Sequence, residues 1–242
     1  MSALLLEISG LVKDHQALRP LRLRELRVTP GRVMSLGGLD AAAAEMFVHL
    51  VTGGALPDEG DVMLFGTNTR HIPDAGAWLR SLDGLGLVSH RAVLVGMLSV
   101  LQNVAMPLTL DLDPIDPAVR PAAEALAREA GIPEAVWDRP LGQVDALLNL
   151  RVRVARAVAA NPRLVIVEHP SAGLPRGEVA QVARDVARVI AARGSALVTL
   201  TADPDWAAGT GGERFALAPA TGELRPADGI LKRLTRVFGG SA

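Results

Sequence analysis

Apolar and polar residues along the chain follow two periods, one typical of strands and one typical of helices. Leucine and charged residues alternate over residues 21–27, as expected for a half-exposed antiparallel strand. Short, mostly apolar runs predict buried strands at 32–36, 164–167 and 196–200. Further strands are predicted at 3–8 and within 56–65, and helices at 41–52, 118–131, 144–160, 179–193 and 230–238.

The order of these elements predicts an α/β fold. Strands come first, followed by one strand–helix unit, a helical stretch and a strand–helix–strand unit. This order favours a mainly parallel sheet with an N-terminal antiparallel β subdomain and an inserted helical subdomain. We expect one domain over 1–242, with an α/β core at 1–88 and 161–226, a helical subdomain at 89–160 and a tail helix at 227–242.

Composition excludes several classes of function. Lys and Arg number 25 and Asp and Glu 26, so the formal net charge of -1 gives no electrostatic footprint for nucleic acid. The chain has no cysteine, which excludes disulfides, thiolate catalysis and cysteine-ligated zinc and favours the cytoplasm. No secretory signal is expected, because Glu7 interrupts the short apolar run near the start of the sequence.

The least polar part of the chain is the stretch 92–110, which carries no charge. Its length would span a bilayer. Gln102 and Asn103 lie in its middle and Pro107 follows them, which argues against a membrane helix. We therefore interpret the stretch as buried or facing a partner, and membrane insertion remains the less favoured alternative.

Three segments resemble a known family in order and spacing. They are LVTGGALPDEGDVMLFG at 50–66, SVLQNVAMPL at 99–108 and ARAVAANPRLVIVEHPSAGL at 155–174. Together they resemble the nucleotide-binding subunit of ABC transporters over roughly residues 4–226. The resemblance implies an ABC-ATPase-like P-loop NTPase core, and it allows the functional positions of the family to be checked one by one.

The phosphate loop of this family is altered at its reactive positions. The family pattern is G-x-x-x-x-G-K-[ST], in which the lysine reaches the β- and γ-phosphates and the hydroxyl ligates Mg²⁺. Gly38 matches the first glycine, whereas Ala43, Ala44 and Glu45 stand at the second glycine, the lysine and the hydroxyl. A glutamate there would repel a polyphosphate.

Asp40 precedes a run of four alanines and is expected to begin a helix. Its side chain can accept hydrogen bonds from the first free N–H groups of that helix. Those N–H groups are the donors that would otherwise bind phosphate. The sequence therefore suggests that Asp40 closes the anion site from within.

The resemblance assigns the remaining nucleotide contacts to altered residues as well. The adenine-stacking aromatic falls at His15, and the glutamine that couples Mg²⁺ to the helical subdomain falls at His90. The signature motif falls at 144–148, where Asp145 replaces the serine that reaches a γ-phosphate on the other protomer. An aspartate there offers only acceptors.

Three further positions concern the reaction itself. The magnesium-positioning aspartate corresponds to Glu168, which could still bind a metal, and the general base corresponds to His169. The switch histidine corresponds to Ala202. Loss of the lysine, the Mg²⁺ hydroxyl and the base together leaves little catalysis, since phosphoryl transfer depends on positioning and charge stabilisation. We expect no catalytic residues and no cofactor.

The function favoured by the sequence is a non-hydrolysing, ABC-ATPase-like subunit with a structural or regulatory role. The resemblance implies a transmembrane partner subunit, a sister ATPase or a second copy of this chain, and a peripheral location on the cytoplasmic face of the inner membrane. Two alternatives stay open. One is an active ATPase that uses ATP and Mg²⁺ with Glu168 and His169, and the other is a decayed paralogue. The residues expected to contact the membrane subunit are Ala92, Val93, Leu94, Val95, Met97 and Leu98.

Overall fold

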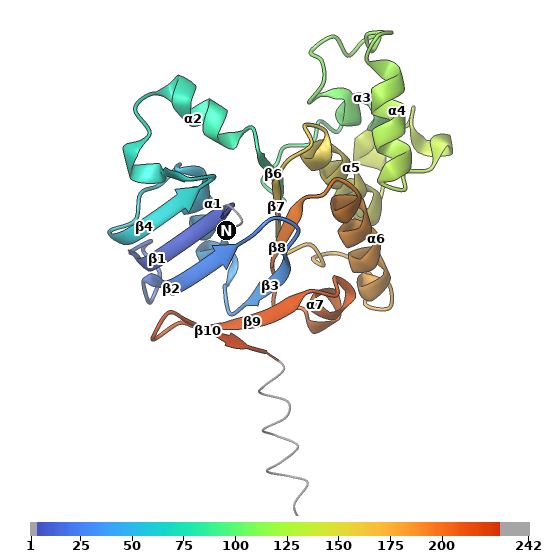
Figure 1. The fold of residues 1–242 in the computed structure, drawn as a ribbon. Helices are drawn as coiled ribbons and strands as arrows, with labels where there is room; N and C mark the ends of the chain where they lie inside the picture. Colours follow the sequence, from blue (N-terminus) through green and yellow to red (C-terminus); the bar gives the residue numbers. More distant parts are fainter. Residues whose placement is uncertain (1–3, 228–242) are drawn as a thin grey trace, which may run out of the picture.

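The computed structural model describes residues 4–227 and shows two sheets and a group of helices (Figure 1). The strands are β1 (Leu6–Lys13), β2 (Leu21–Val28), β3 (Val33–Gly37), β4 (Glu59–Leu64), β5 (Thr67–Asn68), β6 (Leu85–Val88), β7 (Leu164–Glu168), β8 (Ala196–Leu200), β9 (Glu213–Ala218) and β10 (Glu223–Pro226). The α-helices are α1 (Ala41–Thr52), α2 (Ala75–Leu82), α3 (Val100–Ala105), α4 (Arg120–Glu129), α5 (Ala146–Val158), α6 (Val179–Ala192) and α7 (Pro204–Gly209). Short 3₁₀ turns are η1 (Thr69–His71), η2 (Glu134–Val136) and η3 (Leu141–Gln143).

The two sheets differ in topology. The four-stranded sheet has the order β2-β1-β4-β5 and is antiparallel. The six-stranded sheet has the order β10-β9-β3-β8-β7-β6, and only the β9–β10 pair in it is antiparallel. Every residue of β7 and β8 is buried, which explains their near-continuous apolar sequences. The prediction of a mainly parallel core with an antiparallel N-terminal sheet is confirmed.

Helix α1 lies between the two sheets and carries the local features that the sequence predicts. It begins after Asp40 and ends at Gly53, which adopts the left-handed conformation with φ of 71°. Phe47 and Leu50 are at most 1% exposed and belong to the apolar cluster shared by both sheets. Packing on both sides fixes the direction of the helix and so places its N-terminus beside the end of β3.

Helices α3, α4 and α5 lie between β6 and β7 in the chain and form the helical insertion. In Figure 1, α3 and α4 lie at the upper right, away from β1, β2 and β4. The stretch 92–110 is not one long helix, since only α3 within it is helical and a loop precedes it. Within residues 4–227, no helix combines the length and the apolar character that a bilayer crossing requires.

Several predicted boundaries are wrong. The first strand runs over Leu6–Lys13 rather than 3–8, with a register shift between Ser9 and Val12 where it pairs with β4. The helix predicted at 144–160 begins at Ala146, because Asp145 is its cap. The sequence did not predict α2, α3, α7, β5, β6, β9 or β10. The helix predicted at 230–238 lies outside the described residues.

Candidate functional site

The N-terminus of α1 is closed by a side chain of the same turn. The Oδ1 atom of Asp40 accepts a hydrogen bond from the backbone N–H of Ala43 at 2.8 Å. Gly38 permits the chain to turn here, since its φ is 86° and a Cβ would lie 2.6 Å from the carbonyl oxygen of Leu217. The expected cap is therefore present, and one of the free N–H groups of the helix already has an acceptor.

The residues after the cap face different surroundings. Ala44, at the lysine position of the resemblance, is 0% exposed and packs in the core between the sheets. Glu45 projects outward, and its side chain is 46% exposed. The first two turns of α1 therefore offer no cation to an anion, and they present one carboxylate.

A cavity of about 550 Å³ lies beside this helix end. It brings together four of the positions singled out by the sequence, namely His15, Gly38, Asp40 and Ala43. Residues 17–22, Leu217 and Pro219 complete its lining. The stretch 17–22 contributes two arginines, Arg19 and Arg22, that sequence reasoning missed. The site is thus a mixed pocket, in which the apolar side chains and the two arginines come from outside α1.

A guanidinium that sequence reasoning missed lies between two carboxylates. The Nη1 and Nη2 atoms of Arg91 donate to the two carboxylate oxygens of Glu168 at 2.8 and 2.7 Å. The same guanidinium lies 3.5 Å from Oε2 of Glu45. Glu168 ends strand β7 and is only 6% exposed. This bidentate pairing is among the strongest geometries available to a carboxylate.

The residues at the magnesium positions do not fit a metal ion while Arg91 is in this place. Both oxygens of Glu168 already accept hydrogen bonds, and Glu45 faces the same guanidinium. Within residues 4–227, no group of three His, Cys, Asp or Glu side chains has the arrangement needed to hold a metal ion. The suggested metal role of Glu168 therefore has an internal competitor.

His90 and His169 are adjacent in space. The Nε2 atom of His90 lies 3.3 Å from the carbonyl oxygen of His169, and the tautomer with its proton on Nε2 would donate a hydrogen bond to that oxygen. His169 adopts a φ of 42°, a conformation uncommon for residues other than glycine. Its own Nε2 atom is buried without a hydrogen-bond partner. His169 and Ala202, the positions of the base and the switch, line one cavity of about 410 Å³.

The signature position repeats the arrangement seen at α1. Asp145 is the cap of α5, and its Oδ1 atom accepts from the backbone N–H of Leu148 at 2.8 Å. The carboxylate thus lies at the helix end where the resemblance expects a serine hydroxyl. Both helix ends that the family turns toward phosphate carry an aspartate cap in this chain.

The loop 92–98 exposes part of the apolar surface expected of it. Val93 is 75% and Met97 92% exposed, whereas Leu94 packs against the core of the helical region. The side chain of Asn103, itself 0% exposed, bonds to both the N–H and the carbonyl of Val95. The buried side chain of Asn103 therefore holds the backbone of the loop in place, while Val93 and Met97 remain exposed to solvent.

Arg156 of α5 contacts this loop, and Arg153 lies three residues before it on the same helix. Arg156 donates to the carbonyl oxygen of Val93 at 2.8 Å. The Nε atom of Arg153 is buried without a partner. Burial lowers the pKa of both guanidiniums, and the charge of Arg156 lowers the pKa of Arg153 further. No ion pair joins either to an acidic residue of the part of the chain that the structure describes.

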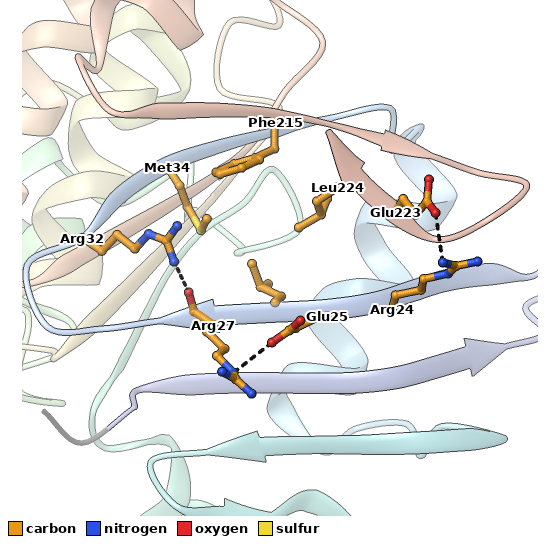
Figure 2. Close-up of a pocket in the computed structure, with 9 residues that line it drawn as sticks. Arg24, Glu25, Arg27, Arg32, Met34, Phe215, Glu223 and Leu224 are labelled. Carbon is orange, nitrogen blue, oxygen red and sulfur yellow. Dashed lines mark hydrogen bonds and ion pairs between the residues drawn. The ribbon is translucent and has the colours of Figure 1, made fainter. Parts of the chain in front are cut away.

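A third cavity, of about 380 Å³, lies between β2 and the β9–β10 hairpin (Figure 2). Its floor is apolar, and three arginines surround it. The ion pairs are Arg24–Glu223 at 2.9 Å, Arg27–Glu25 at 3.1 Å and Arg32–Glu213 at 2.7 Å. Because each of these guanidiniums already has a carboxylate partner, this cavity is poorly suited to an anionic ligand.

No family model matches the chain, but comparison with known proteins finds similar ATP-binding proteins. It is 27% identical over 202 residues to the lipoprotein-releasing system ATP-binding protein LolD of Hyphomonas neptunium, covering 81% of the chain and 87% of that protein. It is 29% identical over 209 residues to the xylose import ATP-binding protein XylG of Pseudomonas fluorescens. That match covers 83% of the chain, which spans only 39% of the length of XylG.

Solved structures share the fold. The chain matches CbiO1 of Clostridium perfringens, part of an ABC transporter complex, with a TM-score of 0.74 at 16% identity, covering 97% of the chain and 96% of CbiO1. It matches a dimeric ATP-binding cassette bound to ADP and phosphate with a TM-score of 0.71 at 19% identity, covering 91% and 98%. The chain therefore has the fold of an ABC-transporter ATP-binding cassette, and its sequence is similar over most of its length to ATP-binding subunits of these transporters.

Proposed function

We propose that this chain is a non-hydrolysing ABC-cassette subunit with a structural or regulatory role in a transport complex. The observation that carries the proposal is the N-terminus of α1, where Asp40 accepts the N–H of Ala43 at 2.8 Å. The buried Ala44 stands where the family has the lysine that reaches the phosphates. The first two turns of α1 would present a triphosphate with a carboxylate and with no cation of their own.

The magnitude of the loss supports the same conclusion. Removal of a single preorganised donor from an active site costs on the order of a hundredfold in rate or more. Here the lysine, the metal-binding hydroxyl and the signature serine are all replaced, and their replacements are an alanine, a glutamate and an aspartate. The effects are not additive, but all act in the direction of lost phosphoryl transfer.

The test measures nucleotide binding and turnover on the purified chain. We expect no saturable heat on titration with Mg-ATP and no phosphate release above background, and a LolD-type relative purified in the same way serves as the active control. Turnover at an ordinary rate for the family would refute the proposal. Clear phosphate density against residues 39–45 in crystals soaked with ATP and magnesium would refute the narrower suggestion that Asp40 closes the anion site.

The proposed partner is a transmembrane subunit that contacts the loop 92–98. Val93 and Met97 offer exposed apolar side chains, and Arg156 donates to the carbonyl oxygen of Val93. Neither Arg156 nor Arg153, three residues before it on α5, forms an ion pair with an acidic residue among those described. This combination suits a cytoplasmic segment that carries an acidic residue among apolar ones. A flat lipid surface fits less well, because the Nε atom of Arg153 is recessed. Pairing with a sister ATPase or with a second copy is part of the same proposal.

Site-specific photocrosslinking tests this contact. A photoreactive residue in place of Met97 is expected to crosslink to an integral membrane protein in detergent-solubilised membranes. The matched control replaces Leu56, an exposed leucine in the turn before β4. Equal crosslinking from both positions, or none from position 97, would contradict the proposed contact.

A second candidate function is an active ATPase with unusual residues. It is favoured by one observation, the buried Nε2 atom of His169, which lacks a partner at the position of the general base. It also requires Glu168 to exchange Arg91 for a metal ion. Mg-ATP-dependent phosphate release that is lost in His169→Ala would favour this candidate over the first.

A further inference from the structure

Two carboxylates converge on one guanidinium at the place where the family would use a divalent cation. Glu45 stands at the position of the metal-binding hydroxyl in α1, and Glu168 stands at the position of the magnesium aspartate after β7. Their nearest oxygens lie 3.5 and 2.7 Å from nitrogens of Arg91. The three residues come from three separate segments of the chain, so their meeting is a product of the fold.

The geometry is that of a bound cation rather than of a loose surface pair. Both oxygens of Glu168 are engaged, and its side chain is only 7% exposed. A buried carboxylate that lacked a partner would be strongly destabilising. The planar, permanently charged guanidinium satisfies it with two parallel hydrogen bonds, and Nη1, one of the two donating nitrogens, also lies 3.5 Å from Oε2 of Glu45. A divalent ion and this guanidinium cannot occupy the same space.

We infer that Arg91 is the resident cation of this site and takes the place of Mg²⁺. The inference builds on the proposed function and deepens it, since it says what stabilises the cassette when no metal–nucleotide complex does. Arg91 directly precedes the loop 92–98. The guanidinium therefore fastens the start of that loop to β7 and to α1 in the absence of any ligand. The loop's position is then independent of both metal and nucleotide.

The test follows thermal stability and divalent-cation response without any nucleotide. Wild-type protein is expected to melt at the same temperature in EDTA and in millimolar Mg²⁺ or Mn²⁺. Arg91→Ala is expected to melt roughly 4–8 °C lower, as suits a partly exposed ion pair in a chain of this size. It should also gain a concentration-dependent stabilisation by Mn²⁺, because Glu168 and Glu45 then lack the guanidinium that joins them, and Glu45 keeps only its 3.5 Å contact with His49. Glu168→Gln added to Arg91→Ala should abolish that gain.

A matched control is Arg193→Ala, which removes a second bidentate arginine that holds Glu129. It should lose stability without acquiring a metal response. If Arg91→Ala does not fold, Arg91→Lys is the second variant. It keeps the positive charge without the bidentate hydrogen bonds, so it should melt below the wild type and show no metal response. Stabilisation of the wild type by Mn²⁺ that disappears in Glu168→Gln would overturn the inference, as would an Arg91→Ala variant without any metal response. Either result is independent of whether the chain hydrolyses ATP.

Discussion

The cap of α1 can be removed by one substitution, Asp40→Ala. The carboxylate makes one 2.8 Å hydrogen bond to the N–H of Ala43 and is otherwise exposed. Loss of such a cap costs about 1 kcal/mol. For a chain of this length, that corresponds to a fall in melting temperature of about 2–4 °C. Asp40→Asn keeps the acceptor and should lose only the charge interaction with the helix end, about 0.3–1 kcal/mol.

The same substitution should open the helix end to anions. A negative charge about 4 Å from the Asp40 carboxylate is repelled by about 1 kcal/mol in water and by about 4 kcal/mol near a protein surface. Asp40→Ala removes this repulsion and frees an N–H donor, so we expect its affinity for inorganic phosphate to rise at least about fivefold. The assay is the shift of melting temperature with phosphate at constant ionic strength.

Asp74→Ala is the matched control for both effects. Asp74 caps α2 in the same manner, with Oδ1 accepting from the N–H of Ala77 at 2.7 Å. It should lose comparable stability, and any phosphate affinity that it gains measures what an uncapped helix end contributes outside the α1 cavity, where Asp74 is absent from the lining. If phosphate shifts the melting temperatures of the wild type and of Asp40→Ala equally, the carboxylate does not exclude anions from the helix end and the reasoning is wrong.

Three other changes have expected outcomes. Gly38→Ala should destabilise the protein by more than 1 kcal/mol in a thermal melt, because its Cβ would lie 2.6 Å from the carbonyl oxygen of Leu217 at a φ of 86°. Hydrogen bonds from Arg32 lower the pKa of Glu213, so this pair stabilises the fold above the ordinary glutamate pKa and loses its contribution as pH falls through the lowered value. NMR titration should show the Glu213 pKa rising in Arg32→Gln. Asn103→Ala should cost about 1–3 kcal/mol and speed amide exchange in the loop that it fastens.

Local patterns in the sequence were sufficient to predict those helices and strands that depend on the residues of a single segment. Asp40 followed by four alanines predicts a capped helix, and the structure has it at Ala41–Thr52. The apolar runs predict β7 and β8 because both strands are buried on both faces. The hairpin of β9 and β10 was missed, although Thr221-Gly222 is a turn signal and Gly222 has a φ of 72°.

Contacts between distant segments were beyond a local interpretation. Arg91 and Glu168 are 77 residues apart, and nothing near either residue in the sequence shows that they pair. Taken alone, Glu168 at the end of a buried strand was interpreted as a possible metal ligand. Only the parallel pairing of β6 with β7 brings the segment after Val88 alongside the end of β7. The presence of Arg91 beside Glu168 is therefore a consequence of the fold and cannot be inferred from either segment alone.

Under the proposed function, the three internal contacts have one property in common: each places a charged group of the chain where the family would bind a charged ligand. Aspartates cap α1 and α5 where the family would receive phosphate, and a guanidinium joins two carboxylates where the family would receive a metal ion. A ligand shifts a conformational equilibrium only by its difference in affinity between two states. Groups that belong to the chain are present in every state and at every nucleotide concentration. A cassette built in this way should keep one conformation whether or not ATP is available, which suits a fixed partner of a transport complex better than its motor.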